Sequence, residues 1–167
     1  RAMLVEPSRA KERILFDALM RSVGSASAAS QRLLFPERLT LSVDDYQLLE
    51  EHQIEFAALG FDIELMGGGN VELGGIPSSM VGESVDNLLY DLLREVEHSG
   101  NVSEKVREDM VRVMAVKGSR RVGRGMSSIE AKALVDEVLG CENYSFSPSG
   151  KPILTELTMD DLKLKLS

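Results

Sequence analysis

The chain has 167 residues, of which 43% are hydrophobic and 28% are charged, and its formal net charge is -8 at pH 7. This length fits one domain or two small lobes, and the composition excludes a chain that is disordered over most of its length. The acidic balance argues against a freestanding nucleic-acid-binding protein, because phosphate contacts need clustered Lys and Arg.

A single cysteine, Cys141, excludes an internal disulfide framework and fits a reducing cytoplasm. No apolar run approaches the roughly 18 residues that a membrane-spanning helix needs, so we expect no membrane partner. The chain begins on an apolar run, Ala2 to Val5, which is typical of a domain taken from a longer protein.

The first 30 residues predict a short buried strand at 2–5 and then a helix from Ser8, because apolar residues recur there on one helical face. Glu6 or Ser8 is suited to cap this helix. Residues 23–30 are Gly, Ser, Ala and one Val, which predicts a flexible connector.

The middle of the chain predicts a strand at 31–41 and a helix at 42–59. Alternating residues at 61–65 and 70–73 flank three glycines and predict a hairpin. A phosphate-binding loop is the other interpretation of Gly67 to Gly69. No Lys-Ser/Thr pair follows them and no helix begins there, so we favour the turn.

The last part predicts three helices with N-caps at Ser84, Ser103 and Ser127. A strand at Ile153-Leu154 and a helix from about Thr158 close the chain. Strands and helices show no regular βαβ period. The pattern therefore predicts an α+β fold with small antiparallel or mixed sheets.

Acids on the first helix could hold Mg²⁺ or Mn²⁺, namely Glu6, Glu12 and Asp17. Basic residues alternate with them, so a solvated, ion-paired helix face is the preferred interpretation. His52 and His98 lack a ligand partner at metal-binding spacing and are interpreted as surface histidines. The segment 117–124 is basic because it carries Lys117, Arg120, Arg121 and Arg124. It either contacts a DNA backbone through these residues or is a solvated loop.

An extended apolar segment with a leading glutamine follows the connector, formed by Gln31, Leu33, Leu34 and Phe35. Such a peptide can dock on a partner with its apolar side chains in a pocket. A strand facing the core is the alternative. Its place directly after the connector favours the partner motif.

Taken in order, these segments resemble the C-terminal domain of MutL DNA mismatch-repair proteins over nearly the whole chain. Residues 6–17 are similar to the family's Asp-Gln-His-Ala-Ala-x-Glu-Arg-Ile-x-Tyr-Glu segment, and residues 147–152 to its Cys-Pro-His-Gly-Arg-Pro turn. Residues 31–36 resemble its sliding-clamp motif. Residues 59–61, the glycine turn and residues 75–77 are similar to its regulatory lobe.

The resemblance implies two lobes, a dimerisation lobe of residues 1–30 and 103–167 and an inserted regulatory lobe of residues 31–102. The homodimer would form through a self-complementary interface. The strand pattern and the resemblance together suggest as its contributors Met3, Val5, Ile153, Leu154, Leu157 and Leu162.

The function implied is to hold two ATPase N-terminal halves together so that they clamp DNA, and to dock the replication sliding clamp. A MutS-type mismatch sensor and DNA would be partners only of the full-length protein, at the nucleoid in the cytoplasm. ATP and Mg would belong to the absent N-terminal half, and no cofactor is expected in this domain.

The resemblance implies that nuclease forms of the family bind metal through a His and a Glu of the first helix, a central Cys, and the Cys and His of the last turn. Glu12 and Asp17 are kept here, but the His and Cys positions are occupied by Ser8, Val116, Ser147 and Ser149. A hydroxyl is a poor substitute for these ligands and valine cannot coordinate a metal. The resemblance therefore implies a domain that is not an enzyme.

Two alternatives remain. One is a manganese-dependent DNA-nicking endonuclease whose metal is held by oxygen alone, from Glu6, Glu12 and Asp17. The other is a regulatory ligand-binding domain of unrelated ancestry, which rests only on the α+β pattern.

Overall fold

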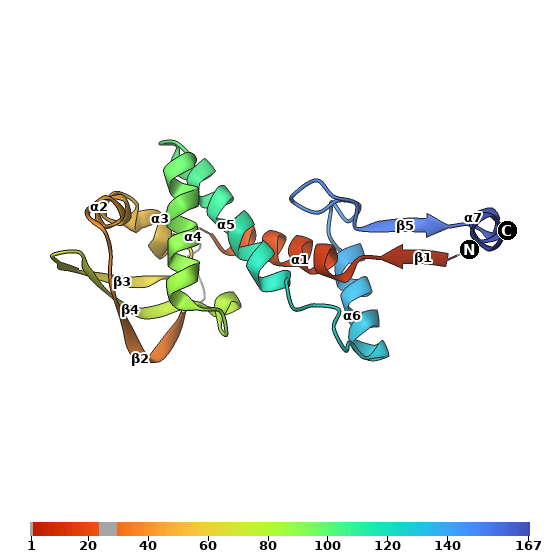
Figure 1. Ribbon diagram of the computed structural model, residues 1–167, viewed down its shortest axis with the longest axis horizontal. Helices are drawn as coiled ribbons and strands as arrows, with labels where there is room; N and C mark the ends of the chain where they lie inside the picture. Colours follow the sequence, from red (N-terminus) through yellow and green to blue (C-terminus); the bar gives the residue numbers. More distant parts are fainter. Residues whose placement is uncertain (1, 24–29) are drawn as a thin grey trace. The chain divides into compact units, whose positions relative to one another are not determined.

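The computed structural model describes residues 2–23 and 30–167. Its helices and two small antiparallel sheets confirm the α+β class (Figure 1). The described chain divides into two compact units: a terminal unit, with the residues up to Asp17 and Ser119–Ser167, and an inserted unit, Ala18–Gly118. The connector expected at 23–30 lies almost entirely outside the described residues.

The boundaries of these units differ from those expected at 30/31 and 102/103. One falls after Asp17, inside helix α1 (Pro7–Ser22), and the other after Gly118, near the end of α5 (Ser103–Ser119). Helix α5 therefore belongs to the inserted unit. Boundaries read from a sequence follow the ends of helices, whereas compact units follow contacts, and one helix can run from one unit into the other.

In the terminal unit, β1 (Ala2–Val5) pairs antiparallel with β5 (Leu154–Leu157), with Ala2 opposite Leu157 and Val5 opposite Leu154. Helices α1 and α6 (Ser128–Leu139) contribute to a small core near the base of this ribbon. That core contains Ala10, Leu134, Val138 and Ile153, with Val5, Ile14, Val122 and Met126 packed against it.

Strand β1 forms where the sequence predicts it, but it is not buried. Met3 and Leu4 are 54% and 52% exposed, and only the Val5 end of the strand packs against the core. A two-stranded ribbon has two faces and two open edges, so a neighbouring helix can cover only a small part of it. The expectation of a buried strand is therefore wrong.

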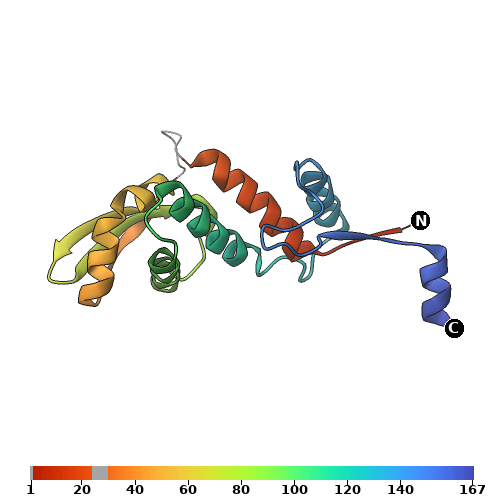
Figure 2. The ribbon, with the colours of Figure 1, turned by 90° about the horizontal axis from the view of Figure 1, so that it is seen from above.

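The chain ends with α7 (Met159–Leu166), at the end of the ribbon away from α1 and α6 (Figure 2). A capping box begins this helix at Thr158, where the sequence predicts the helix to start. The Thr158 hydroxyl accepts the Asp161 N–H at 3.2 Å, and the Asp161 carboxylate accepts the Thr158 N–H at 2.9 Å. No residue of α7 is buried.

The inserted unit contains a three-stranded antiparallel sheet in the order β2 (Ser30–Thr40), β4 (Asn70–Pro77), β3 (Asp62–Gly67). The turn between β3 and β4 confirms the predicted hairpin. Gly67, Gly68 and Gly69 all have positive φ, at 86°, 62° and 82°. A Cβ on Gly69 would also lie 2.7 Å from a backbone oxygen of Leu41, so the turn requires glycine there.

The helix predicted at 42–59 is two helices, α2 (Val43–Glu51) and α3 (Gln53–Ala58), which break at His52. Phe56 of α3 packs edge-to-face on Phe61, with ring centroids 5.5 Å apart. After a short 3-10 turn, Ser78–Met80, helix α4 (Val85–His98) runs across one face of the sheet (Figures 1 and 2). It buries Val85, Leu88, Leu89, Leu92, Leu93 and Val96.

Over the residues that the structure describes, no helix is long and apolar enough to cross a membrane.

Candidate functional site

The first candidate site is the face of α1 that carries Ser8 and Glu12, one helical turn apart. Glu12 is only 8% exposed, and its Oε1 accepts a hydrogen bond of 2.6 Å from the Ser149 hydroxyl. The Ser8 hydroxyl instead donates to the Val122 carbonyl at 3.4 Å. Ser147 is buried, and its hydroxyl accepts the Lys151 N–H at 3.2 Å within the turn. The structure thus brings Glu12 and Ser149 together.

Two arginines of α1 hold the turn at residues 147–152 in place. Arg13 Nε donates to the Phe146 carbonyl at 3.0 Å, and an Arg9 guanidinium nitrogen donates to the Pro152 carbonyl at 2.9 Å. A third bond, from the Ser147 N–H to the Lys151 carbonyl at 2.8 Å, closes the turn. The turn is therefore anchored at both ends, which keeps Ser149 against Glu12.

The three acids of this region do not converge on one point. Glu6 accepts the Arg9 N–H at 2.7 Å and so caps α1, and Asp17 accepts Arg13 at 3.0 Å. Glu12 is engaged by Ser149. Within the described ranges, no three His, Cys, Asp or Glu side chains are grouped as a metal site would need. Hydroxyls also supply neither the nitrogen nor the sulfur ligands of a borderline metal, so these residues do not fit one.

The second candidate site is the ribbon and α7. Of the residues expected at a dimer interface, Met3 is exposed, and Val5, Leu154, Leu157 and Leu162 are partly buried. Ile153 is the exception, at 1% exposure in the core, so it cannot face a partner.

Several exposed apolar residues on or beside this ribbon were not predicted from the sequence, although the helical spacing of apolar residues in α7 indicates some of them. Met159, Leu162 and Leu166 recur at helical spacing on one side of α7. A shallow groove of about 320 Å³ lies along the base of the ribbon, lined in part by Leu4, Pro7 and Leu154. The additional exposed residues are Leu4, Met159, Leu164 and Leu166.

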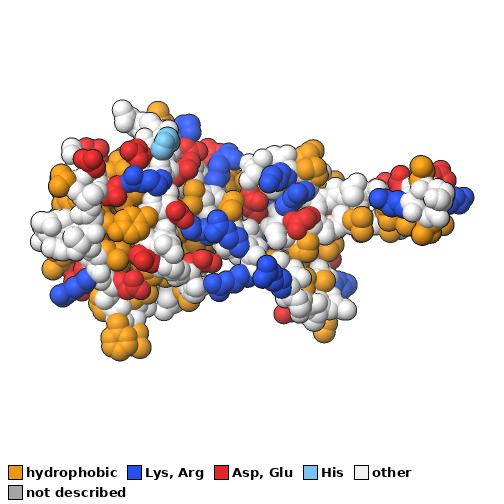
Figure 3. Space-filling view, in the orientation of Figure 1, with side chains coloured by type: hydrophobic (Ala, Val, Ile, Leu, Met, Phe, Trp, Pro, Cys, Tyr) orange, Lys and Arg blue, Asp and Glu red, His pale blue; other side chains and the backbone are white. Residues whose placement is uncertain are grey.

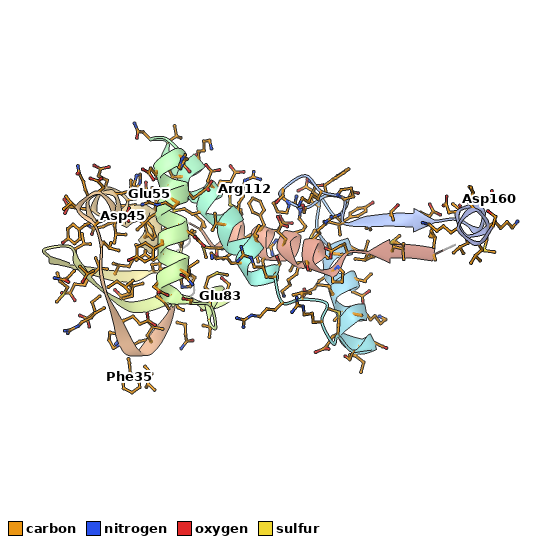
Figure 4. The ribbon with its side chains drawn as sticks, in the orientation of Figure 1. Phe35, Asp45, Glu55, Glu83, Arg112 and Asp160 are labelled. Atoms are coloured by element: carbon orange, nitrogen blue, oxygen red, sulfur yellow. The ribbon has the colours of Figure 1, made fainter. Side chains whose placement is uncertain are left out.

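The third candidate site is a bulge in β2. The pairing of β2 with β4 shifts register between Arg32 and Glu37, so the residues between them leave the ladder. Leu34 and Phe35 are consequently 88% and 80% exposed, and Phe35 points away from the sheet (Figure 4). Gln31 remains paired with β4 and Leu33 is partly buried.

A groove of about 360 Å³ lies beside this bulge. Leu33, Leu34 and Pro36 form its apolar part. Its polar part comes from Arg32, Asp62, Glu64 and Glu72. The predicted partner motif is therefore presented outward and is not part of the core.

The fourth candidate site is the basic segment 117–124. Lys117 does not share the exposed surface of this segment, because its side chain is 8% exposed and forms an ion pair with Asp91 of α4. Arg120, Arg121 and Arg124 are exposed. Lys117 lies in the last turn of α5 and is buried there. Neither interpretation of this segment, a DNA contact or a solvated loop, therefore fits Lys117, whose charge is paired inside the inserted unit.

His52 is also not a surface histidine. Its side chain is 14% exposed, and its Nδ1 lies 3.6 Å from Glu55 Oε2. Glu55 Oε1 accepts a hydrogen bond of 2.8 Å from the Ser103 hydroxyl. Burial raises the pKa of Glu55, but the Ser103 bond, a backbone bond and the nearby His52 and Arg107 outweigh it, so the pKa is lowered. This cluster joins α3 to α5.

Comparison with known protein families identifies the family of the chain. A family model described as "MutL C terminal dimerisation domain" matches residues 2–126. The chain belongs to this family. The matched part of the MutL domain includes β1, α1, the inserted unit and the basic segment.

Individual MutL proteins match the chain further, over 96% of its length. "DNA mismatch repair protein MutL" of Bacteroides fragilis is 29% identical over 161 residues, which is 26% of that protein. The MutL proteins of Geotalea daltonii and Desulforamulus reducens are 29% and 30% identical, over 27% and 25% of their lengths. The chain thus spans about a quarter of the length of these MutL relatives.

Proposed function

We propose that this chain is the homodimerisation module of a MutL-type mismatch-repair protein and that it does not cut DNA itself. One structural observation carries the proposal: β1, β5 and α7 expose apolar side chains that their own chain does not cover. Exposed Met3, Leu4, Leu164 and Leu166 lie on the ribbon and on the helix beyond it.

A two-stranded ribbon is at best marginally stable in water unless another element packs on it. A second copy would supply that element, because the same patch meets itself across a two-fold axis. The interface would involve Met3, Leu154, Leu157 and Leu162, with Val5 at its inner end. A stable dimer needs at least about 1,000 Å² of buried surface, and the exposed apolar residues of α7 would extend the interface beyond the ribbon.

Sedimentation equilibrium tests this directly. We expect a dimer of about twice the 18.3 kDa mass. Leu157→Glu should give a folded monomer, since a charge would be buried in the interface without a partner. Val43→Glu places the same charge on an 82% exposed valine of the inserted unit and should leave the dimer intact. A parent chain that stays monomeric at high micromolar concentration contradicts the proposal.

The proposal that the domain is not a nuclease rests on the chemistry of its side chains. Glu6, Glu12 and Asp17 are each engaged by a different partner, and hydroxyls stand where the resemblance places metal ligands. The alternative is the manganese nuclease with an oxygen-only site. A plasmid-nicking assay with Mn²⁺ and the sliding clamp should show no nicking above that of a Glu12→Ala control. Clamp-stimulated nicking that Glu12→Ala abolishes would establish the alternative.

We further propose that the bulge of β2 docks the replication sliding clamp. The support is its geometry, since Leu34 and Phe35 stand outside the ladder while Gln31 remains held in it. Apolar side chains presented on an otherwise paired strand are suited to enter a pocket of a partner.

In the whole protein, the dimer would hold two ATPase halves together so that nucleotide-driven closure clamps DNA. ATP, Mg and the MutS-type partner belong to that larger protein, of which this chain corresponds to about a quarter. Leu157→Glu in the full-length protein should abolish ATP-dependent retention on circular DNA while ATP binding by each half persists. Unchanged retention would show that the halves are joined elsewhere.

A further inference from the structure

A groove of about 400 Å³ lies in the terminal unit, between α1, the segment 121–126 and α6. Its lining includes Val122, Met126 and Leu134, which also contribute to the small core. Lys11 lines it from α1, and Arg121 and Arg124 line it from the segment before α6. Figure 3 shows Lys and Arg side chains gathered over the segment between α5 and α6.

These three cations are free to bind an anion. Among the described residues, none of Lys11, Arg121 and Arg124 forms an ion pair or a side-chain hydrogen bond, whereas Lys117 and Arg13 have carboxylate partners. Two acids also line the groove, Glu130 and Glu137. The Glu130 Oε2 accepts the Ser127 N–H at 2.8 Å to cap α6, which holds this carboxylate at the helix start but leaves its negative charge in place. Three cations against two carboxylates leave the groove with a small excess of positive charge.

The segment that presents the arginines is anchored to α1. The Ser8 hydroxyl donates to the carbonyl of Val122, and a Cβ on Gly123 would lie 3.3 Å from Pro7. Gly123 has a φ of 97°, a conformation that side chains disfavour. Glycine at position 123 thus permits close packing on the start of α1, and the flanking arginines project from a fixed backbone.

We propose that this groove binds the phosphodiester backbone of duplex DNA, with Lys11, Arg121 and Arg124 contacting phosphates. Guanidinium groups match the geometry of phosphate oxygens, and such contacts position a protein on a duplex without reading its sequence. Among the described residues that line the groove none is aromatic, so it lacks the stacking surface of a single-strand site. The choice of DNA over another polyanion rests on the proposed role in mismatch repair.

The local arrangement is compatible with the acidic chain as a whole. With a net charge of -8, most of the surface repels DNA, and three cations in one groove would bind it weakly and in one orientation. Dimerisation would place two such grooves on one assembly, so that each contributes to the binding of one duplex. The site therefore suits a secondary DNA contact, in addition to the proposed closure of the two ATPase halves around DNA.

Fluorescence anisotropy with a labelled duplex of about 30 base pairs tests the groove, over roughly 50 to 200 mM salt. We expect the parent chain to bind at low salt. Arg121→Gln with Arg124→Gln should weaken binding by about tenfold and reduce the slope of log affinity against log salt by about 2. Arg121→Lys with Arg124→Lys should keep most of the affinity, since the charge is retained.

The matched control is Lys132→Gln with Lys151→Gln, which removes the same charge from exposed lysines of the same unit that do not line the groove. The proposal is overturned if this control weakens binding equally, or if the parent does not bind duplex at low salt. Displacement of the duplex by tripolyphosphate at the same phosphate concentration would overturn it in favour of a small-anion pocket. Sedimentation of each variant separates a loss of DNA binding from a loss of the dimer.

Discussion

The Ser149 hydroxyl donates a hydrogen bond of 2.6 Å to Glu12 Oε1 and so links the last turn of the terminal unit to α1. A carboxylate that is only 8% exposed is thereby satisfied by a neutral hydroxyl. Arg9 and Arg13 hold the ends of the same turn through carbonyl oxygens and not through Glu12. In this arrangement the Glu12 carboxylate joins α1 to the turn at residues 147–152, so the hydrogen bond is a structural contact.

Removing this hydroxyl should cost stability. Ser149→Ala leaves Glu12 without its donor, so we expect the free energy of unfolding to fall by about 1 kcal/mol, because water can reach the exposed side of the turn. Urea denaturation measures the change. Ser128→Ala, on an exposed serine of α6, should have little effect. Equal loss in both variants would show that the Glu12 contact contributes nothing.

Truncating Phe35 should weaken clamp docking without destabilising the chain. Phe35 is 80% exposed, so Phe35→Ala removes little internal packing, while an aromatic anchor in a partner pocket contributes roughly 2 kcal/mol or more. We expect an affinity loss of at least about tenfold for the sliding clamp, measured by isothermal titration calorimetry. Val43→Ala, equally exposed in the same unit, is the control. Unchanged affinity for Phe35→Ala would remove the bulge from the proposed function.

The cluster around Glu55 should make stability depend on acid pH. Burial raises the pKa of Glu55, but hydrogen bonds and nearby cations lower it further, below the ordinary value of 4.5. A carboxyl whose pKa is lower in the folded than in the unfolded state stabilises the fold at pH values above its unfolded-state pKa. This contribution is lost as the pH falls through the folded-state pKa. Glu55→Gln should therefore destabilise the chain at neutral pH and flatten its loss of stability below about pH 4.5.

Urea midpoints of parent and variant, measured from neutral to acid pH, give this comparison. Glu64→Gln, on an exposed residue of β3, serves as the control and should keep the parent's pH dependence. If Glu55→Gln follows the parent at every pH, the Ser103 and His52 contacts do not favour the charged form.

Deleting α7 should weaken the dimer and leave the monomer fold intact. No residue of α7 is buried within its own chain, so removal of residues after Thr158 exposes no internal core. If α7 packs on the partner, the dimer dissociation constant should rise by at least about tenfold in sedimentation equilibrium. The control is the thermal unfolding of the parent and the truncated chain at concentrations where each is monomeric, and the two should unfold alike. A truncated chain with the parent's dimer affinity would confine the interface to the ribbon.

Local chemistry made much of the fold predictable from the sequence. Ser127 and Thr158 begin helices because their hydroxyls accept free N–H groups of the first turn, and both do so in the structure. The glycine run at 67–69 forms its hairpin turn because only glycine adopts three successive positive φ values at little cost. The order of these segments also revealed the family.

Local chemistry did not determine which side chains are buried in the folded chain. Ile153 and Met3 are both apolar residues in or beside ribbon strands, yet one is in the core and the other is exposed. Lys117 looks like any surface lysine until Asp91 of another helix pairs with it. The bulge that presents Phe35 arises from a register shift in the pairing of β2 with β4, whose paired residues are at least 30 positions apart in the sequence.

The sequence by itself determined the type and order of most helices, strands and turns, because those depend on neighbouring residues. The tertiary structure decided which side chains are available. Glu12 accepts a hydrogen bond from Ser149, which lies 137 positions further along the chain. Arg121 and Arg124 line a groove with Lys11 of α1 and have no ion-pair partner among the described residues. Hydrogen bonds and ion pairs between distant residues have no counterpart in local spacing, so a sequence names the candidates and only the folded chain separates them.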